Sequence, residues 1–349
     1  MAHKVTIQPS GNTFTTEENE TILSAAMRSG YTLPYGCRNG ACAACKGKII
    51  EGTVDHGNPQ SSALVDFEKR DGLALFCQAT PLSDLVIEAR EIETTGDIEV
   101  RRLPSRVQSI LRVSDDIVIL KLKLPSNERF QFFAGQYIDV LLRGGKRRSY
   151  SMGNPPHEAE YIELHVRNMA NGAFTTQVFE TLKEKDILRF EGPLGTFFLR
   201  EDTDKPIIFV ASGTGFAPIK SIIEYTFEQG IDRQMVLYWG GRRPRDIYMS
   251  DLASQWQKDH EHFNFVPVVS DAEPEDKWDG RTGMVHVAAM EDFPDMANHE
   301  AYSCGVPAMV EAAHKDSLSS AIYLRTHFSL MHLPRRLIQN LKTKVALGT

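Results

Sequence analysis

Alternating apolar and polar residues near the start of the chain predict a β-hairpin followed by a short helix. In the segment HKVTIQPSGNTFTT, two alternating runs flank a turn at residues 10–12, which is the pattern of two paired strands. The next segment predicts a helix that opens at Glu20-Thr21 and ends at Gly30. The apolar face of this helix consists of Ile22, Leu23, Ala26 and Met27. After a long loop, the run LVIEAR closes the first unit as a further strand.

The pattern changes along the rest of the chain. Short strands with turn residues between them recur from about residue 105 to residue 200, which predicts a small antiparallel β-barrel. Beyond it, buried-type strands such as PIIFVAS alternate with helical segments such as APIKSIIEYTFEQ, and this alternation predicts a parallel sheet. We therefore expect several domains, of β and α/β class. Their expected bounds are a first domain at 1–95, a linker at 96–104, the barrel at 105–200, the α/β domain at 201–323 and a tail at 324–349.

Composition narrows the classes of function. The 349 residues carry a formal net charge of −7, which argues against a general nucleic-acid binder. The sequence has no apolar run of about 18 residues, the length that a transmembrane helix needs. Its start, MAHKVTIQPSG, lacks the charged and then apolar leader of a secreted protein. We therefore expect a cytoplasmic protein.

Four of the five cysteines have a spacing that suits a two-iron cluster. Cys37, Cys42 and Cys45 lie in the run GCRNGACAACKG, and Cys77 follows in LFCQA. This C-x4-C-x2-C spacing with a distant fourth cysteine is the plant-type [2Fe–2S] ferredoxin pattern. A zinc site would favour two C-x2-C pairs, and only one is present. Zinc binding and purely structural cysteines remain the alternatives.

Three further motifs follow the cysteines in chain order. They are Arg148-Ser149-Tyr150-Ser151, Gly213-Thr214-Gly215 followed by Ala217-Pro218, and Cys304-Gly305-Val306-Pro307. Taken one at a time, each motif also has a simpler interpretation. In the same order, these are a strand with a polar edge, a tight strand–helix turn and a buried cysteine. In this order, behind the cysteine loop, they resemble the ferredoxin–NADP⁺ reductase superfamily over about residues 1–320. Within it, the chain is similar to the reductase components of bacterial oxygenases and to the CDP-6-deoxy-Δ3,4-glucoseen reductases.

The resemblance implies a β-grasp [2Fe–2S] domain, an FAD-binding β-barrel and a parallel α/β NAD(P)-binding domain. It places Arg148 at the flavin pyrophosphate, Tyr150 against the isoalloxazine ring and Ser151 near flavin N5. A guanidinium suits a diphosphate, and an aromatic face suits a flat ring. The segment HVRNMANGAFTTQV resembles the second flavin motif, in which Gly172 and Thr175 meet the pyrophosphate. Alternatively, Thr175 is the N-cap of a helix.

The last two motifs imply a nicotinamide nucleotide site. Small residues at Gly213, Thr214 and Gly215 let a pyrophosphate approach a helix N-terminus. By resemblance, Cys304 and Gly305 lie beside the nicotinamide ring. The resemblance therefore implies that Cys304, together with the Ser151 of the flavin motif, is close to the reacting atoms.

The resemblance favours NADH, and NADPH remains possible. Arg242 or Arg243, after the second strand of the α/β domain, suits a ribose 2′-phosphate. The same side chains suit surface ion pairs with Asp246 and Asp251.

The implied function is that of a reductase that passes electrons from NAD(P)H through FAD and a [2Fe–2S] cluster to a protein acceptor. We expect a dehydrase as the acceptor, as for CDP-6-deoxy-Δ3,4-glucoseen reductase, with Arg38 and Asn39 exposed on the cluster loop towards it. An alternative is the reductase component of an aromatic-ring mono- or dioxygenase, of phenol, benzoate or methane hydroxylase type. A second alternative is a ferredoxin-like carrier that does not oxidise NAD(P)H.

The tail departs from the pattern of the family. It carries five basic residues and no acidic residue, namely Arg325, Arg335, Arg336, Lys342 and Lys344. Three interpretations are open. The segment is a solvated basic helix, a helix that docks on a partner or a membrane surface, or a stretch whose reading frame differs from that of relatives beyond about residue 320.

Overall fold

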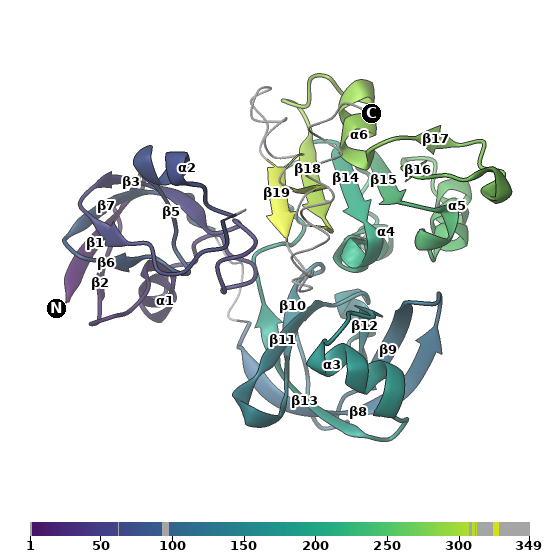
Figure 1. Ribbon diagram of the computed structural model, residues 1–349, viewed down its shortest axis with the longest axis horizontal. Helices are drawn as coiled ribbons and strands as arrows, with labels where there is room; N and C mark the ends of the chain where they lie inside the picture. The colour runs from purple at the N-terminus through teal and green to yellow at the C-terminus, as the bar shows by residue number, and fades with distance from the viewer. Residues whose placement is uncertain are drawn as a thin grey trace.

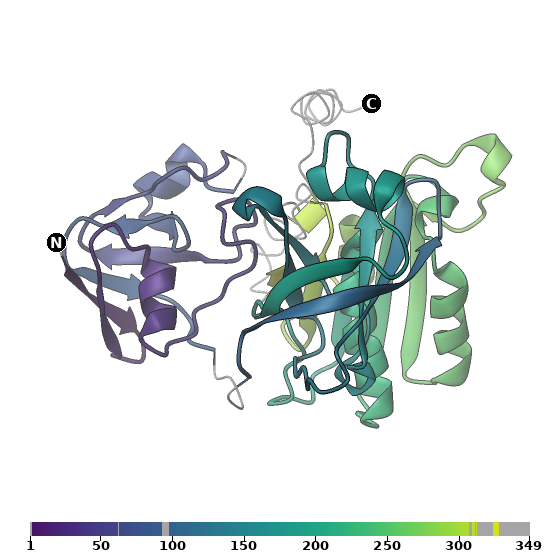
Figure 2. The ribbon, with the colours of Figure 1, turned by 90° about the horizontal axis from the view of Figure 1, so that it is seen from below.

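A computed structural model describes residues 2–61, 63–92, 98–306, 309–310, 312 and 324–327. Three units follow one another along the chain; in Figure 1 the first lies at the left, and the second lies at the bottom, below the third. Figure 2 shows the loops of the N-terminal unit turned towards the other two units. The multidomain architecture expected from the sequence is confirmed. The expected basic tail lies outside the described residues, apart from one short strand at 324–327.

The N-terminal unit is a five-stranded mixed sheet that packs against one helix. The strand order is β2-β1-β7-β3-β5, and β1 and β7 run parallel at its centre. The strands are β1 (His3–Gln8), β2 (Thr13–Thr16), β3 (Lys46–Glu51), β5 (Leu73–Leu75) and β7 (Leu85–Glu88). The other elements are the pair β4 (Val54–Asp55) and β6 (Thr80–Pro81), and the helices α1 (Ile22–Arg28) and α2 (Asp66–Arg70).

The predicted hairpin and helix of this unit are confirmed. Strands β1 and β2 pair antiparallel, with Thr6 opposite Thr13. The hydroxyl of Thr21 caps α1 by accepting a hydrogen bond from the Ser24 amide. The apolar face of α1 is buried against the sheet, so this unit has a core of its own.

The second unit is a six-stranded antiparallel barrel. The strand order is β11-β10-β13-β8-β9-β12, and a bridge between Met152 and Leu164 joins the two edges. The strands are β8 (Arg101–Arg112), β9 (Ile117–Lys123), β10 (Tyr137–Leu141), β11 (Arg147–Ser151), β12 (Tyr161–Arg167) and β13 (Ile187–Leu194). Short helical segments are η1 (Arg143–Gly145), η2 (Pro156–Glu158), α3 (Ala173–Thr176) and η3 (Gln177–Thr181).

The linker expected at 96–104 is too long, because β8 already begins at Arg101. Leu103 is buried, whereas its neighbours Arg102 and Pro104 are exposed. This is the period of two that a strand requires. Charged residues and a proline made the segment look like a linker, but its partner β13 makes it a strand.

The third unit is a parallel sheet with helices on both faces. Its strand order is β17-β16-β15-β14-β18-β19, and all neighbouring strands in the described ranges pair parallel. The strands are β14 (Ile207–Ser212), β15 (Met235–Gly241), β16 (Phe263–Val269), β17 (Arg281–Thr282), β18 (Glu300–Cys304) and β19 (Leu324–His327). The helices are α4 (Phe216–Glu228), α5 (Ser250–Asp259) and α6 (Val285–Asp292), with the short turns η4 (Gly213–Gly215), η5 (Pro244–Asp246) and η6 (Pro274–Asp276).

Alternate residues of β14 and β15 face opposite sides of this sheet, as a strand dictates. Phe209 packs with α4 and α5 on one side, and Val210 packs with α6 on the other. Buried on both faces, these strands are apolar throughout. The parallel sheet predicted from the alternation of strands and helices is confirmed.

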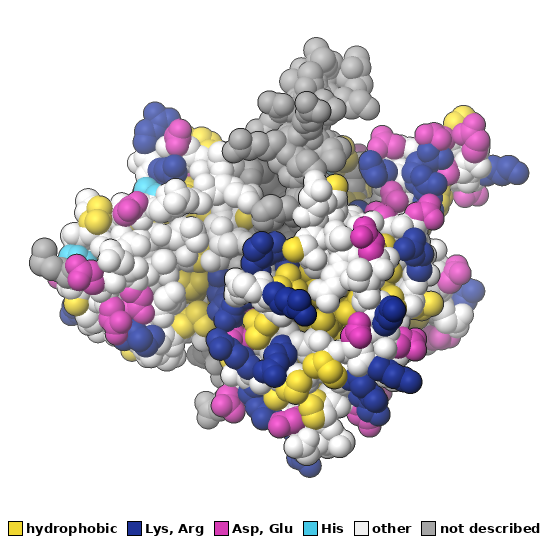
Figure 3. Space-filling view, turned by 60° about the horizontal axis from the view of Figure 1, so that its bottom comes forward, with side chains coloured by type: hydrophobic (Ala, Val, Ile, Leu, Met, Phe, Trp, Pro, Cys, Tyr) yellow, Lys and Arg dark blue, Asp and Glu magenta, His cyan; other side chains and the backbone are white. Residues whose placement is uncertain are grey.

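The outer face of the barrel concentrates positive charge in a chain that is acidic overall. Figure 3 shows Lys and Arg side chains gathered over this unit. The exposed basic residues on β8, β11, β13 and the β10–β11 connection are Arg102, Arg106, Arg112, Arg143, Lys146, Arg147 and Arg189. Such a surface attracts anionic groups. Among the described residues, no helix combines the length and apolar composition that crossing a membrane requires.

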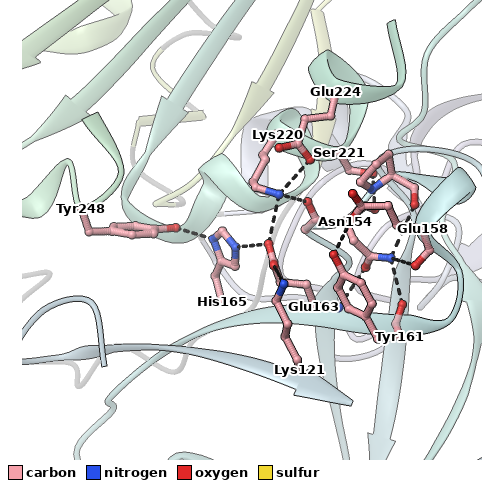
Figure 4. A network of polar contacts seen from close by, with 12 residues as sticks. Lys121, Asn154, Glu158, Tyr161, Glu163, His165, Lys220, Ser221, Glu224 and Tyr248 are labelled. Atoms are coloured by element: carbon pink, nitrogen blue, oxygen red, sulfur yellow. Dashed lines mark hydrogen bonds and ion pairs between the residues drawn. The ribbon is translucent and has the colours of Figure 1, made fainter. Parts of the chain in front are cut away.

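A buried ion pair joins the barrel to the third unit. Lys220 of α4 lies 3.1 Å from Glu163 of β12, and its ammonium also donates to the Gly153 carbonyl at 3.1 Å. Figure 4 shows these side chains converging between the two units. Glu224, one turn further along α4, lies 2.8 Å from the same ammonium. Every hydrogen of the ammonium thus has a partner, as a buried charge requires.

His165 extends this network to the far side of Glu163. One ring nitrogen lies 3.1 Å from the Glu163 carboxylate and the other 2.7 Å from the Tyr248 hydroxyl. Burial lowers the pKa of His165, so the ring is neutral. A carboxylate only accepts, so Nε2 donates to Glu163 and Nδ1 accepts from Tyr248. Burial by itself would raise the pKa of Glu163, but the His165 hydrogen bond and the Lys220 charge outweigh it and lower that pKa.

The change Glu163→Gln should lower the free energy of unfolding at pH 7 by about 3 kcal/mol, because it removes one of the two carboxylates that neutralise the buried ammonium of Lys220. The pKa of Glu163 is lower in the folded than in the unfolded chain. Its stabilisation is therefore complete above the unfolded value of about 4.3 and is lost as the pH falls towards the folded value. Calorimetry at pH 7 and at acid pH should show that the free energies of unfolding of the variant and the wild type differ less in acid.

The matched control is Glu291→Gln, which breaks an exposed ion pair with Arg281. Surface pairs contribute under about 1 kcal/mol, so this variant should unfold close to wild type. An equal loss of unfolding free energy in both variants would contradict the buried-pair interpretation. So would a difference between Glu163→Gln and the wild type that stays as large in acid as at pH 7.

Candidate functional site

The structure brings the four cysteines of the predicted cluster loop together. Three lie on the connection between α1 and β3, and the fourth follows β5; all four are buried. Their thiols form two hydrogen-bonded pairs, Cys37 with Cys42 and Cys45 with Cys77. The hydrogen bond with Cys42 lowers the pKa of Cys37 to about 6, although burial opposes it.

The surroundings of the thiols suit negatively charged sulfur. The amide of Cys37 donates to Cys42 Sγ at 3.2 Å, and the amides of Asn39 and Ala41 point at Cys37 Sγ from 3.5 and 3.4 Å. Backbone donors of this kind stabilise cluster sulfurs and tune the potential.

The arrangement in two pairs fits a binuclear cluster. Within the described part of the chain, no three His, Cys, Asp or Glu side chains are grouped to hold a single metal ion. A [2Fe–2S] cluster with four cysteine ligands needs two thiolates for each iron. The donor set and its pairing therefore suit two irons better than one zinc ion.

The cluster loop is covered from two sides. Arg38 contacts Asp139 of the barrel at 3.0 Å, and Cys37 and Cys42 pack with Val310 of the third unit. Of the two residues expected to face a partner, Asn39 is exposed, whereas the Arg38 side chain is only 31% exposed. The loop is therefore mostly an internal interface, which the sequence did not indicate.

The predicted flavin motif lies on β11, where its side chains alternate between two faces. Tyr150 is buried with its ring 5.3 Å from Phe174. The Ser151 hydroxyl is buried, and no described group bonds to it. Arg148 is half-buried and donates to the Arg147 carbonyl; no acidic side chain in the described ranges pairs with it. An uncompensated cation and an unbonded buried hydroxyl on one strand fit an anionic, polar cofactor.

The expected second flavin motif forms a tight loop before α3. Gly172 is the N-cap of this helix, so the alternative of Thr175 as N-cap is wrong. The hydroxyl of Thr175 donates to the carbonyl of Met169 or Gly172, each 3.1 Å away. Thr175 thus shapes the loop, and the backbone amides of the loop remain candidates for a pyrophosphate contact.

The two nucleotide motifs meet at the ends of adjacent parallel strands. Strand β14 leads into the Gly213–Gly215 turn, and β18 ends at Cys304, opposite Ala211. A Cβ on Gly215 would lie 2.1 Å from the Cys304 carbonyl oxygen, and one on Gly305 would lie 2.1 Å from Ser212 Oγ. Only glycine permits this approach. The carboxyl ends of parallel strands are where such sheets bind nucleotides.

The barrel reaches the same turn through Arg167, at the end of β12. A guanidinium nitrogen of Arg167 lies 3.2 Å from the position that a Cβ of Gly213 would take. His165 lies two residues before Arg167 on the same face of β12, and its ring lies 6.4 Å from the ring of Phe216. Sequence reasoning did not single out Arg167; the only signal was its place at the start of the second flavin motif.

Arg242 and Arg243, the two arginines considered for a ribose 2′-phosphate, differ in their surroundings. Arg243 pairs with Glu273 and Asp276, not with Asp246 or Asp251 as considered from the sequence. The Asp246 carboxylate instead accepts from the backbone amides of Arg242 and Arg243. The Arg242 side chain is exposed. Two carboxylates therefore already neutralise Arg243, one of the two arginines considered for a 2′-phosphate.

Three family models match successive parts of the chain. They describe a 2Fe-2S iron-sulfur cluster binding domain at residues 5–82, an oxidoreductase FAD-binding domain at 104–199 and an oxidoreductase NAD-binding domain at 209–315. The residues present fit all three groups, by their thiols, by the polar atoms of β11 and by the glycine turn.

Curated relatives match the chain nearly end to end. The CDP-6-deoxy-L-threo-D-glycero-4-hexulose-3-dehydrase reductase of Yersinia pseudotuberculosis is 39% identical over 336 residues, which is 96% of this chain and 100% of the relative. The reductase component of phenol 2-monooxygenase from Pseudomonas sp. strain CF600 is 36% identical and covers 94% of each chain.

Solved structures show the same architecture. The Amycolatopsis cytochrome P450 reductase GcoB aligns with a TM-score of 0.71 and 33% identity, over 94% of this chain and 98% of that one. The ferredoxin reductase of carbazole 1,9a-dioxygenase aligns with a TM-score of 0.66 at 24% identity, over 95% and 99%. This second likeness bears on the fold alone.

The change Arg148→Ala should weaken FAD binding about tenfold or more, because a charge-assisted contact to diphosphate contributes about 1.5–3 kcal/mol. Fluorescence titration of flavin-free protein with FAD measures this. The control Arg143→Ala removes an exposed arginine of the same barrel and should leave the affinity unchanged. Equal FAD affinity in both variants would contradict the assignment of Arg148 to the flavin pyrophosphate.

The change Cys42→Ser should abolish cluster reduction while NADH still reduces the flavin, because the thiolates and the flavin motif lie on different domains. Anaerobic absorption and EPR spectra after adding NADH measure the two separately. If flavin reduction also collapses in a folded Cys42→Ser protein, the order of electron transfer proposed for these sites is wrong.

Proposed function

Since the chain belongs to the family of iron–sulfur flavoprotein reductases that join a [2Fe–2S] domain to FAD- and NAD-binding domains, we propose that its electron acceptor is a dehydrase acting on a CDP-linked deoxyhexulose. The chain itself is an oxidoreductase. One observation carries the choice of acceptor: 39% identity to a dehydrase reductase over the relative's whole length. The phenol 2-monooxygenase reductase component follows at 36%, so an oxygenase is the second candidate.

When bound, the FAD accepts the two electrons of a hydride from NAD(P)H, and the cluster carries electrons onward one at a time. The chain's own residues bind and orient these groups. Arg148 neutralises the diphosphate, and the Ser151 hydroxyl is free to hydrogen-bond the flavin ring. Cys304 and Gly305, packed against the Gly213–Gly215 turn, line the floor of the nicotinamide site. No acid–base pair is required for hydride transfer.

NADH is the proposed nucleotide. Arg243 is already neutralised by Glu273 and Asp276, and a 2′-phosphate would have to displace two carboxylates. Like charges repel, so a phosphate beside these two carboxylates is unfavourable. NADH lacks the phosphate and avoids this cost.

Anaerobic titration with NADH, and separately with NADPH, tests the reductase function. We expect NADH to bleach the flavin and to produce the EPR signal of a reduced [2Fe–2S] cluster, with NADPH less effective. Flavin and cluster that stay oxidised with both nucleotides would reject the function and leave only a ferredoxin-like carrier.

The acceptor is tested by adding the Yersinia dehydrase with its sugar nucleotide, or the phenol hydroxylase component with phenol. We expect NADH oxidation to rise in proportion to the dehydrase and to stay at the background rate with the hydroxylase. The reverse result would select the oxygenase alternative and overturn the proposed acceptor.

A further inference from the structure

The loop that holds three of the cysteines is anchored on the barrel by side chains that the cofactor sites do not explain. The amide of Tyr35 donates to Thr196 Oγ1 at 3.0 Å, and the Tyr137 hydroxyl donates to the Gly36 carbonyl at 2.7 Å. Arg38, directly after Cys37, donates to Asp139 at 3.0 Å. The anchoring therefore runs along the loop up to the first cysteine.

Asp139 is the charged member of this anchor, and it is buried in the barrel wall. Its side chain is 5% exposed, on the apolar strand β10. One carboxylate oxygen accepts from Arg38. The other accepts from the Ser149 hydroxyl at 2.6 Å. Ser149 lies directly opposite Asp139, on β11 between Arg148 and Tyr150.

One carboxylate thus links the cluster loop to the flavin motif. Through Ser149 it contacts the strand proposed to bind FAD, and through Arg38 it contacts the residue next to Cys37. A buried carboxylate needs compensation for its charge. A second cation, Arg147, lies 3.7 Å away but is also bonded to Glu191. Arg38 is accordingly the close partner of Asp139.

We propose that Arg38 and Asp139 are positioning residues that hold the cluster docked against the flavin motif during internal electron transfer. This rests on the proposed function. Oxidation of NADH to NAD⁺ releases two electrons and one proton. Each electron that reaches the cluster reduces one ferric iron to ferrous, and the cluster passes it to the protein acceptor before it takes up the next. Two such transfers discharge one NADH, and the acceptor is the oxidant.

The test compares Arg38→Gln with Arg101→Gln in the FAD- and cluster-loaded protein. Arg101 is a matched control, because its side chain is 33% exposed against 31% for Arg38, and its ion pair with Glu128 lies within the barrel. Anaerobic stopped-flow mixing with NADH, with freeze-quench EPR, follows flavin bleaching and cluster reduction separately. Flavin bleaching should proceed at the wild-type rate in both variants.

Cluster reduction should slow about tenfold in Arg38→Gln alone, because a docked state populated about one-tenth of the time lowers the observed rate by that factor. Arg38→Lys, which keeps the charge, should recover part of the rate. Wild-type cluster reduction in Arg38→Gln would overturn the proposal. Absence of cluster reduction in the wild type would instead overturn the proposed function.

A second measurement reports whether the cluster loop is docked on the barrel when no electrons are transferred. Hydrogen–deuterium exchange of the oxidised holoprotein should be faster over residues 33–42 in Arg38→Gln than in Arg101→Gln. If Arg38→Gln loses its cluster, Asp139→Asn takes its place, because it keeps the Ser149 bond and lies far from the cysteines in sequence. Exchange as slow as in the wild type in these variants would overturn the proposal.

Discussion

The buried ion pair between Glu163 and Lys220 determines how the barrel and the nucleotide-binding domain meet. Two charges withdrawn from water are tolerated only when they face each other and their other hydrogen bonds are made. His165 and the Gly153 carbonyl complete this arrangement. Lys220 belongs to the helix that starts at the Gly213–Gly215 turn, and Glu163 lies on the strand that leads to the second flavin motif. The pair therefore holds together the two elements that adjoin the proposed nucleotide and flavin motifs.

The same barrel organises the cluster on its other side. Strand β10 presents Tyr137 and Asp139 to the cysteine loop, while its neighbour β11 carries the flavin motif. The proposed nucleotide, flavin and cluster sites are thus all arranged around strands β10, β11 and β12 of one small sheet. An electron carrier depends on such proximity, and here polar contacts to the barrel and apolar packing against Val310 of the third unit provide it. Polar contacts also leave an interface able to open, unlike a large apolar one.

This arrangement changes the picture of how an acceptor reaches the cluster. The four thiols are buried, and the loop around them is shared between three domains. Only the edge near Asn39 remains exposed there. An acceptor must therefore approach this edge or meet the protein after the loop has separated from the barrel. The basic outer face of the barrel lies beside this interface and offers attraction to an acidic surface.

The sequence by itself determined the local chemistry of this protein. The spacing of Cys37, Cys42 and Cys45 indicated an iron–sulfur loop, and strand–helix alternation predicted the parallel sheet, because spacing and periodicity act over a few residues. It misjudged where β8 begins, since a strand rich in arginine is recognised only by its partner. It gave no indication that Arg38 meets Asp139 or that Glu163 meets Lys220. Only the tertiary structure decided these contacts, because charged residues far apart in sequence acquire meaning when burial forces them to pair.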